Sequence, residues 1–294
     1  MEIKKIFNLN MYDGFKYDQC WIIIHYLKKY FKIVFVDNIE DSDIVINGVW
    51  SKHITSKNLI LPKKFNILWN YENVNIQILD KFNVIFSDLR LNLKNNIRIP
   101  LFYYYNFMCV KEPRERTNEE INEIIKKKTD FCCFLISNEN GYDMFGTNFN
   151  GCNLRNNFFK NLNKIKKVNS GGNALNNINY IIPRNPEDTK KFIEKHKFMI
   201  CFENSSRDGY ITEKIFQTYE YNTVPIYWGH KNNYNILNNK AYIKYDIENE
   251  EKIIKNLIRL NTDIQEYRDI LKEKLFLGKK QKDILELDLS KYFI

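Results

Sequence analysis

Residues Lys197–His230 read KFMICFENSSRDGYITEKIFQTYEYNTVPIYWGH. The apolar run at the start has the length of a buried strand, and it ends in the polar pair Glu203 and Asn204. After a polar loop, the pattern predicts a helix over Thr212–Tyr221 and a second buried strand over Val224–Tyr227. A strand, a crossover helix and another strand predict a parallel sheet, so this stretch decides the fold class.

The same alternation extends in both directions along the chain. We expect further strands at Ile3–Leu9, Lys32–Val36, Asp43–Gly48, Phe65–Trp69, Asn83–Phe86, Phe131–Ile136 and Ala241–Tyr245. We expect further helices at Cys20–Phe31, Leu154–Ile165, Pro186–His196 and Glu248–Leu275. The expected fold is therefore α/β, with two Rossmann-like domains facing a cleft, the GT-B architecture.

A change of composition marks the expected domain boundary. The stretch Val110–Asp130 carries KEPRER and then the charged run NEEINEIIKKK. We expect an N-terminal α/β domain over 1–110, a linker and exposed helix over 111–130, a C-terminal α/β domain over 131–275 and a tail over 276–294.

The composition limits the kinds of partner. The formal net charge is +9, but the lysines are spread over all 294 residues and no nucleic-acid-binding motif is present, so no nucleic-acid partner is expected. A solvated basic surface is the preferred interpretation, and weak peripheral contact with membrane headgroups is the alternative. Without an apolar run of membrane-spanning length or a visible signal peptide, the expected location is the cytoplasm.

The six cysteines do not form a metal-binding pattern. None forms a CxxC pair and the four histidines are scattered, so no zinc site is expected. Cys132, Cys133 and Cys201 lie in apolar runs and are expected to be buried thiols, which fits a reducing compartment.

The loop and helix start after Asn204 have the features of a phosphate site. The first turn of a helix presents free N–H groups and a positive dipole end, and Lys214 would add a full charge. Thr212 or Asp208 could cap this helix, and Glu213 could accept hydrogen bonds from ribose hydroxyls. An ordinary capped strand–loop–helix explains these residues equally well on physical grounds alone.

Three blocks of sequence resemble one enzyme family. FENSSRDGYITEK followed by VPIYWG is similar to the signature of the α-1,3/1,4-fucosyltransferases, glycosyltransferase family ten, and bacterial members resemble the chain most. LRNNFF with the later NSGG, and the block Asn70–Asn73, agree in order with other motifs of that family. The chain departs from the family at Val74, and Gly141–Gly151 is a longer loop than usual.

The resemblance implies a function and a set of site residues. The implied reaction is transfer of fucose from GDP-fucose, the donor substrate, to a glycan acceptor. It would proceed with inversion and without a metal or other cofactor. Glu72 in the N-terminal, acceptor-side domain would be the general base. Arg155 and Lys214 would hold the diphosphate, while the nucleotide or fucose would contact Asn204, Tyr210 and Glu213, and Glu203 would shape the same pocket.

The acceptor follows from the resemblance alone. It implies O3 of GlcNAc or Glc in an N-acetyllactosamine-type glycan, giving an α-fucoside of the Lewis type on lipopolysaccharide or protein. Two alternatives remain open, namely a GT-B enzyme for another nucleotide sugar or acceptor, and a basic binding module without activity.

Two other features admit a functional interpretation. Asp41-Ser42-Asp43 is a formal D-x-D of metal-dependent transferases, although a solvated entry to the next strand is preferred. The aromatic run Phe102–Tyr105 could stack on an acceptor sugar, although packing is slightly preferred.

Overall fold

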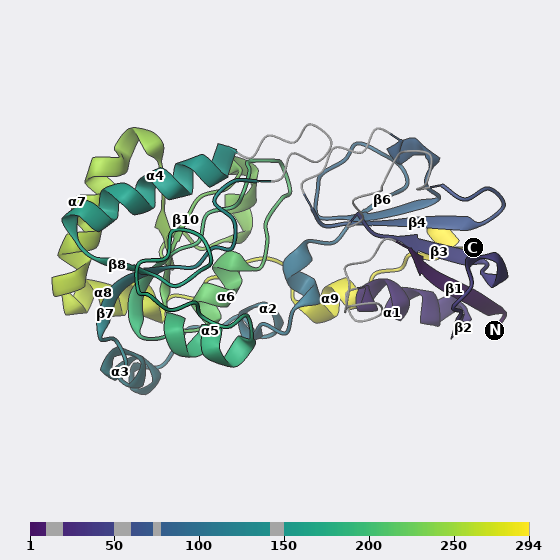
Figure 1. Cartoon of the computed structure of the whole chain (residues 1–294). Helices are drawn as coiled ribbons and strands as arrows, with labels where there is room; N and C mark the ends of the chain where they lie inside the picture. Colours follow the sequence, from purple (N-terminus) through teal and green to yellow (C-terminus); the bar gives the residue numbers. More distant parts are fainter. Residues whose placement is uncertain (10–19, 50–59, 73–77, 142–149, 294) are drawn as a thin grey trace. The chain divides into compact units, whose positions relative to one another are not determined.

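The computed structural model describes residues 1–9, 20–49, 60–72, 78–141 and 150–293. The chain divides into two compact units, each built on its own parallel sheet (Figure 1). Unit 1 contains Met1–Asn106 and Gln281–Ile294. Unit 2 contains Phe107–Asp143 and Asn148–Lys280.

The sheet of unit 1 has the order β2-β1-β3-β4-β5-β6, and every neighbouring pair is parallel. Its strands are β1 (Ile3–Leu9), β2 (Lys32–Phe35), β3 (Ile44–Asn47), β4 (Phe65–Asn70), β5 (Val84–Ser87) and β6 (Asn96–Arg98). All residues of β3 and β5 are buried, which is why these strands are continuous apolar runs rather than alternating ones.

Both faces of this sheet are covered. Helix α1 (Trp21–Tyr30) packs on one face, where the rings of Tyr26 and Phe86 stack with centroids 6.3 Å apart. On the other face, Leu68 and Ile85 form a core cluster with Val49 and Phe82.

Unit 1 is completed by a segment from the far end of the sequence. Helices α9 (Gln281–Leu285) and α10 (Ser290–Phe293) pack against α1, and α9 lies beside it in Figure 1. Tyr26 donates its hydroxyl hydrogen to the carbonyl of Ile284, and the amide of Gln281 donates to Tyr103 O at 2.6 Å. This segment is therefore part of the unit 1 core.

The sheet of unit 2 has the order β11-β10-β9-β7-β8, again with every neighbouring pair parallel. Its strands are β7 (Asp130–Phe134), β8 (Val168–Ser170), β9 (His196–Ile200), β10 (Val224–Tyr227) and β11 (Ile243–Lys244). Its helices are α2 (Met108–Lys111), α3 (Asn118–Lys126), α4 (Asn150–Ile165), α5 (Pro186–Ile193), α6 (Lys214–Glu220), α7 (Glu250–Thr262) and α8 (Ile264–Lys272).

The main core of unit 2 joins the sheet to several helices. Phe158 and Leu162 of α4 and Leu257 of α7 pack with Phe198 and Ile226 of the sheet. A smaller cluster of Cys133, Ile193 and Met199 lies apart from it. All six cysteines are buried and free, so the expectation of buried thiols at positions 132, 133 and 201 is confirmed.

The predicted α/β fold with two Rossmann-like parallel sheets is confirmed, but the units differ from the expected domains at three places. The division falls after Asn106 rather than at residue 110. The expected linker 111–130 belongs to unit 2, because α3 buries Ile121 and Ile124 in its core. Most of the expected tail 276–294 belongs to unit 1, because Gln281–Ile294 packs there.

Several element boundaries also differ from the expectation. The helix expected over Glu248–Leu275 is broken at Asp263, whose carboxylate accepts the Glu266 N–H and caps α8. The helix expected over Pro186–His196 ends at Ile193, because His196 begins β9. The loop expected over Gly141–Gly151 lies outside the described residues at positions 142–149, and α4 already begins at Asn150.

One lysine of the charged run is an unfavourable feature of unit 2. Burial lowers the pKa of Lys128 to about 7, and its ammonium donates to Glu194 O at 2.9 Å and Thr223 Oγ1 at 3.0 Å. Because the unfolded chain holds this proton more tightly, the charge destabilises the fold fully below pH 7. The penalty disappears as pH rises towards the ordinary lysine pKa near 10.4.

We therefore expect Lys128→Met to raise the free energy of unfolding at pH 7 by on the order of 1 kcal/mol. The gain should shrink between pH 7 and pH 10. Denaturant unfolding of both proteins across this range measures it. Lys127→Met is the matched control. The Lys127 ammonium lies 3.7 Å from the carboxylate of the same residue, Glu194, but its side chain is 61% exposed and therefore carries no burial penalty. An equal gain in both variants at every pH contradicts the assignment.

Candidate functional site

The polar residues of Lys197–His230 collect at the carboxyl edge of the unit 2 sheet, just after β9. Glu203 is the centre of this group and is fully buried. Its carboxylate accepts the Thr212 N–H at 2.8 Å, the Thr212 hydroxyl at 2.8 Å and the Tyr227 hydroxyl at 3.1 Å. It also pairs with the Lys214 ammonium at 3.1 Å. Each carboxylate oxygen thus accepts two hydrogen bonds, which stabilises a buried negative charge.

Lys214, the first residue of α6, is oriented by this carboxylate. Burial lowers its pKa, but Glu203 and Glu213 more than offset burial, so the net pKa is raised and the side chain stays charged. Its side chain keeps 25% exposure. A positive charge is therefore held in place at a partly open position.

Arg155 of α4 lies on the same edge and is only 5% exposed. Its guanidinium donates to Asn204 Oδ1 at 2.6 Å and to Asn138 O at 2.8 Å. Burial lowers its pKa. Within the described residues no carboxylate pairs with Arg155, and its Nε has no hydrogen-bond partner. A buried cation without a counter-ion is suited to receive an anionic ligand.

A glycine lets α4 approach the β9 loop. A Cβ built on Gly151 would lie 2.1 Å from Glu203 O and 2.8 Å from Asn204 C. Both are backbone atoms, so they cannot move aside as a side-chain tip would. The first turn of α4 can therefore deliver Arg155 to Asn204 only because residue 151 has no side chain.

We expect Gly151→Ala to destabilise the protein by about 1–3 kcal/mol, because overpacking pushes α4 away from the loop. Arg155 should lose its contact with Asn204 in the same variant. Thermal unfolding measures the loss of stability. The control is Asn153→Ala, an exposed position in the same turn. If Gly151→Ala behaves like the control, the close approach is not important.

The loop before α6 is fixed by a residue that the sequence did not single out. Asn233, 1% exposed, accepts the Gly209 N–H at 3.1 Å and donates to Tyr210 O at 2.6 Å. Gly209 has φ of +91°, which favours glycine. No local sequence pattern predicts this role of Asn233, because its hydrogen-bond partners lie more than 20 residues earlier.

Six of the seven predicted site residues lie in unit 2, five of them in the short segment after β9 and the sixth, Arg155, bonded to that segment. Tyr210 is buried, and Asn204 and Glu213 are partly exposed. The expectation that Thr212 or Asp208 caps the helix is wrong. The residue before α6 is Glu213, and its side chain makes no capping bond. Thr212 donates its hydroxyl hydrogen to Glu203 instead.

Glu72, the predicted base, belongs to unit 1. It lies two residues beyond the end of β4 and is partly exposed. Tyr71 before it is buried, and its hydroxyl is 2.7 Å from that of Tyr104. The Trp69 ring lies 5.1 Å from the Tyr71 ring, so aromatic side chains surround this strand end.

The aromatic run Phe102–Tyr105 mostly packs inside unit 1. Phe102 and Tyr103 are buried, and Tyr104 bonds Tyr71, whereas Tyr105 is 42% exposed. The D-x-D carboxylates are exposed, and Asp43 accepts the Lys5 N–H at 2.8 Å. Among the described residues there is no cluster of three His, Cys, Asp or Glu side chains that could bind a metal.

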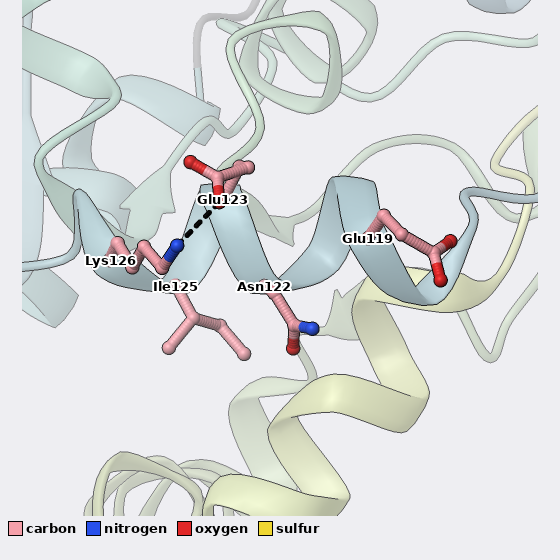
Figure 2. A pocket seen from close by; sticks show the side chains of 5 residues that line it. All are labelled: Glu119, Asn122, Glu123, Ile125 and Lys126. Carbon is pink, nitrogen blue, oxygen red and sulfur yellow. Dashed lines mark hydrogen bonds and ion pairs between the residues drawn. The ribbon is translucent and has the colours of Figure 1, made fainter.

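A hollow on α3 is a poor candidate for the site. Figure 2 shows its lining side chains, Glu119, Asn122, Glu123, Ile125 and Lys126. Glu123 and Lys126 pair at 2.6 Å, and both are about two-thirds exposed. A solvated ion pair of this kind contributes at most about 1 kcal/mol, and its long side chains are not held in one geometry.

Membrane-spanning helices are a separate question. In the described part of the chain, no helix has both the length and the apolar character needed to cross a membrane.

Two fucosyltransferases are similar to this chain in sequence. An α-(1,3)-fucosyltransferase of Helicobacter pylori is 28% identical over 69% of this chain and 45% of its own length. A putative fucosyltransferase of Acanthamoeba polyphaga mimivirus is 25% identical over 98% of this chain and 46% of its own length. The chain thus spans about half the length of the curated relatives it matches.

A solved structure and a family model complete the comparison. The crystal structure of an α1,3-fucosyltransferase with GDP-fucose has the same fold, with a TM-score of 0.69 and 22% identity over 98% of this chain and 92% of that one. Residues 125–282, more than half of the chain, match the model for glycosyltransferase family 10 (fucosyltransferase) C-term. This chain is therefore a member of glycosyltransferase family 10.

Proposed function

We propose that the protein transfers L-fucose from GDP-fucose to a sugar hydroxyl, with inversion and without a metal. The observation that carries the proposal is the Arg155 guanidinium. It is buried and lacks a carboxylate partner among the described residues, and Asn204 aligns it on the edge where Lys214 also lies. The relatives that share this family supply the choice of fucose and GDP.

The proposed chemistry places two demands on the protein. The leaving GDP gains negative charge, and fixed cations stabilise that charge without reorganising during the reaction. Arg155 and Lys214 meet this demand, and Asn204, Tyr210 and Glu213 contact the nucleotide or fucose. Glu203 does not contact the donor in this proposal, because its two oxygens are already occupied by Thr212, Lys214 and Tyr227.

The second demand is removal of a proton from the acceptor hydroxyl. We assign it to Glu72, a partly exposed carboxylate beside buried aromatic rings. One base and one displacement give inversion, so a β-linked donor yields an α-fucoside.

The proposed acceptor is O3 of GlcNAc or Glc in an N-acetyllactosamine-type glycan of lipopolysaccharide or protein. Weak peripheral contact with a membrane in the cytoplasm fits the net charge of +9.

Titration with nucleotides tests the donor. GDP and GDP-fucose should raise the Tm, whereas UDP-glucose and CMP-sialic acid should not. Stabilisation by UDP-glucose alone would instead favour a transferase for another nucleotide sugar. Salt-sensitive binding to polyanions without any nucleotide effect would favour a basic binding module. Transfer that is lost in EDTA and restored by a divalent cation would contradict metal independence.

We expect Glu72→Gln to slow transfer by about 100-fold, because the amide cannot accept the proton. Calorimetry should give an unchanged Kd for GDP. The matched control is Glu40→Gln, an exposed acid of the same unit. Unchanged transfer in Glu72→Gln would contradict the assignment of the base.

A further inference from the structure

Two buried asparagines end neighbouring strands at the carboxyl edge of the unit 1 sheet. Asn47 ends β3 with 0% exposure, and Asn70 ends β4 with 1%. In the part of the chain that the structure describes, neither polar atom of the Asn47 amide has a hydrogen-bond partner, and neither does Asn70 Oδ1. A buried amide that makes no hydrogen bonds lowers the free energy of unfolding, because it has lost its bonds to water.

The sheet register places these amides together. Asn47 of β3 pairs with Leu68 of β4, and two residues further along β4 Asn70 pairs with Ser87 of β5. Because side chains alternate between faces along a strand, Asn47, Asn70 and Ser87 lie on the same face. They form a polar row at the end of three adjacent strands.

A third asparagine on this face shows that the unpaired state is not general. Asn66, at the amino end of β4, is also buried. Its Oδ1 accepts the Leu61 N–H at 3.0 Å, and its Nδ2 donates to Leu61 O and Lys64 O, both at 2.9 Å. The amide at the amino end is thus fully bonded by the protein, whereas those at the carboxyl end are not.

The position and chemistry of the unpaired amides indicate a ligand. Ligands bind at the carboxyl ends of the strands in open α/β sheets. The proposed base, Glu72, follows Asn70 by two residues at this same edge. An amide is uncharged and offers both a donor and an acceptor, which matches the hydroxyl groups of a neutral sugar.

We propose that Asn47, with Asn70 beside it, is a specificity-determining residue that hydrogen-bonds hydroxyl groups of the acceptor sugar. This inference rests on the proposed function, and it assigns Asn47, a residue outside the family motifs identified above. Because Asn47 is sealed from solvent, the acceptor has to displace the groups that cover it.

The test is Asn47→Leu, which keeps the approximate volume and removes both polar atoms. We expect the Tm to stay the same or to rise, because an unpaired amide has been removed. With N-acetyllactosamine as acceptor, KM should rise about tenfold, as loss of one hydrogen-bonding side chain predicts. The Kd of GDP-fucose and its hydrolysis rate without acceptor should not change.

Asn66→Leu is the matched control, since it removes a buried amide from the same face. It should lower the Tm, and below that Tm it should leave KM for N-acetyllactosamine unchanged. The inference is overturned if Asn47→Leu keeps the acceptor KM, or if its Tm falls as in Asn66→Leu. The latter result means that a buried water bonds the amide.

Failure of the proposed function gives a different result. A wild-type protein that neither binds nor hydrolyses GDP-fucose refutes the fucosyltransferase assignment. If the wild-type protein transfers fucose to N-acetyllactosamine and Asn47→Leu does so with the same KM, only the role of Asn47 is refuted.

Discussion

Arg155→Ala is expected to lower kcat/KM for fucose transfer by about 10²–10³-fold, or roughly 2.7–4 kcal/mol in the barrier. The guanidinium is buried, and within the described residues no carboxylate forms an ion pair with it. In the proposed reaction this charge stabilises the leaving diphosphate. GDP should also bind more weakly, because the proposal assigns the same donors to the product.

Arg155→Lys distinguishes geometry from charge. Lysine keeps the charge but lacks the planar fork that reaches Asn204 and Asn138 together. We expect it to recover part of the lost affinity for GDP and little of the transfer rate. Steady-state kinetics and calorimetry on the folded variants measure both. Wild-type kinetics in Arg155→Ala would remove the main support for the proposed function.

Glu203→Ala is expected to destabilise unit 2 by about 3–5 kcal/mol, because it removes a fully buried carboxylate that pairs with Lys214 and accepts three further hydrogen bonds. Lys214, Tyr227 and both donors of Thr212 would lose their acceptor at once. For a domain of the size of unit 2, each kcal/mol shifts the Tm by about 2–4 °C. The shift should therefore be readily visible in thermal unfolding.

Two controls separate this buried network from the charge of the segment. Glu203→Gln keeps the shape and one acceptor oxygen, so it should lose less stability than alanine. Glu213→Ala removes an acid from the same segment, but this side chain is partly exposed and makes no capping bond, so the Tm should hardly change. Equal losses in Glu203→Ala and Glu213→Ala would show that the network contributes little.

The sequence predicts the central strands well but misses two of the four edge strands. In β3, β4 and β5 the apolar runs are long because both faces are buried. The edge strands β6 and β8 have three residues each, with sequences NIR and VNS, and their short polar pattern gives no recognisable period. The position of α9 and α10 on α1 depends on contacts about 260 residues apart, which no local pattern encodes.

For the candidate site, the motif identifies the segment but not the contacts within it. The pattern from Glu203 to Lys214 predicts a polar loop and a helix start, and both are present. It does not reveal that Thr212 bonds Glu203 rather than capping the helix. Nor does it reveal the closeness of Gly151 to the Glu203 carbonyl, because that distance depends on how α4 packs.

The return of Gln281–Ile294 to unit 1 has a consequence for biosynthesis. Unit 2 is almost continuous in sequence, so a nascent chain can finish it once residue 280 has left the ribosome. Unit 1 precedes unit 2 in the sequence. Tyr26 and Tyr103 can nevertheless form their hydrogen bonds to Ile284 and Gln281 only after those residues have been synthesised. The half that is translated first should therefore fold last, and a released fragment that ends at residue 280 should be protected from protease only over 107–280.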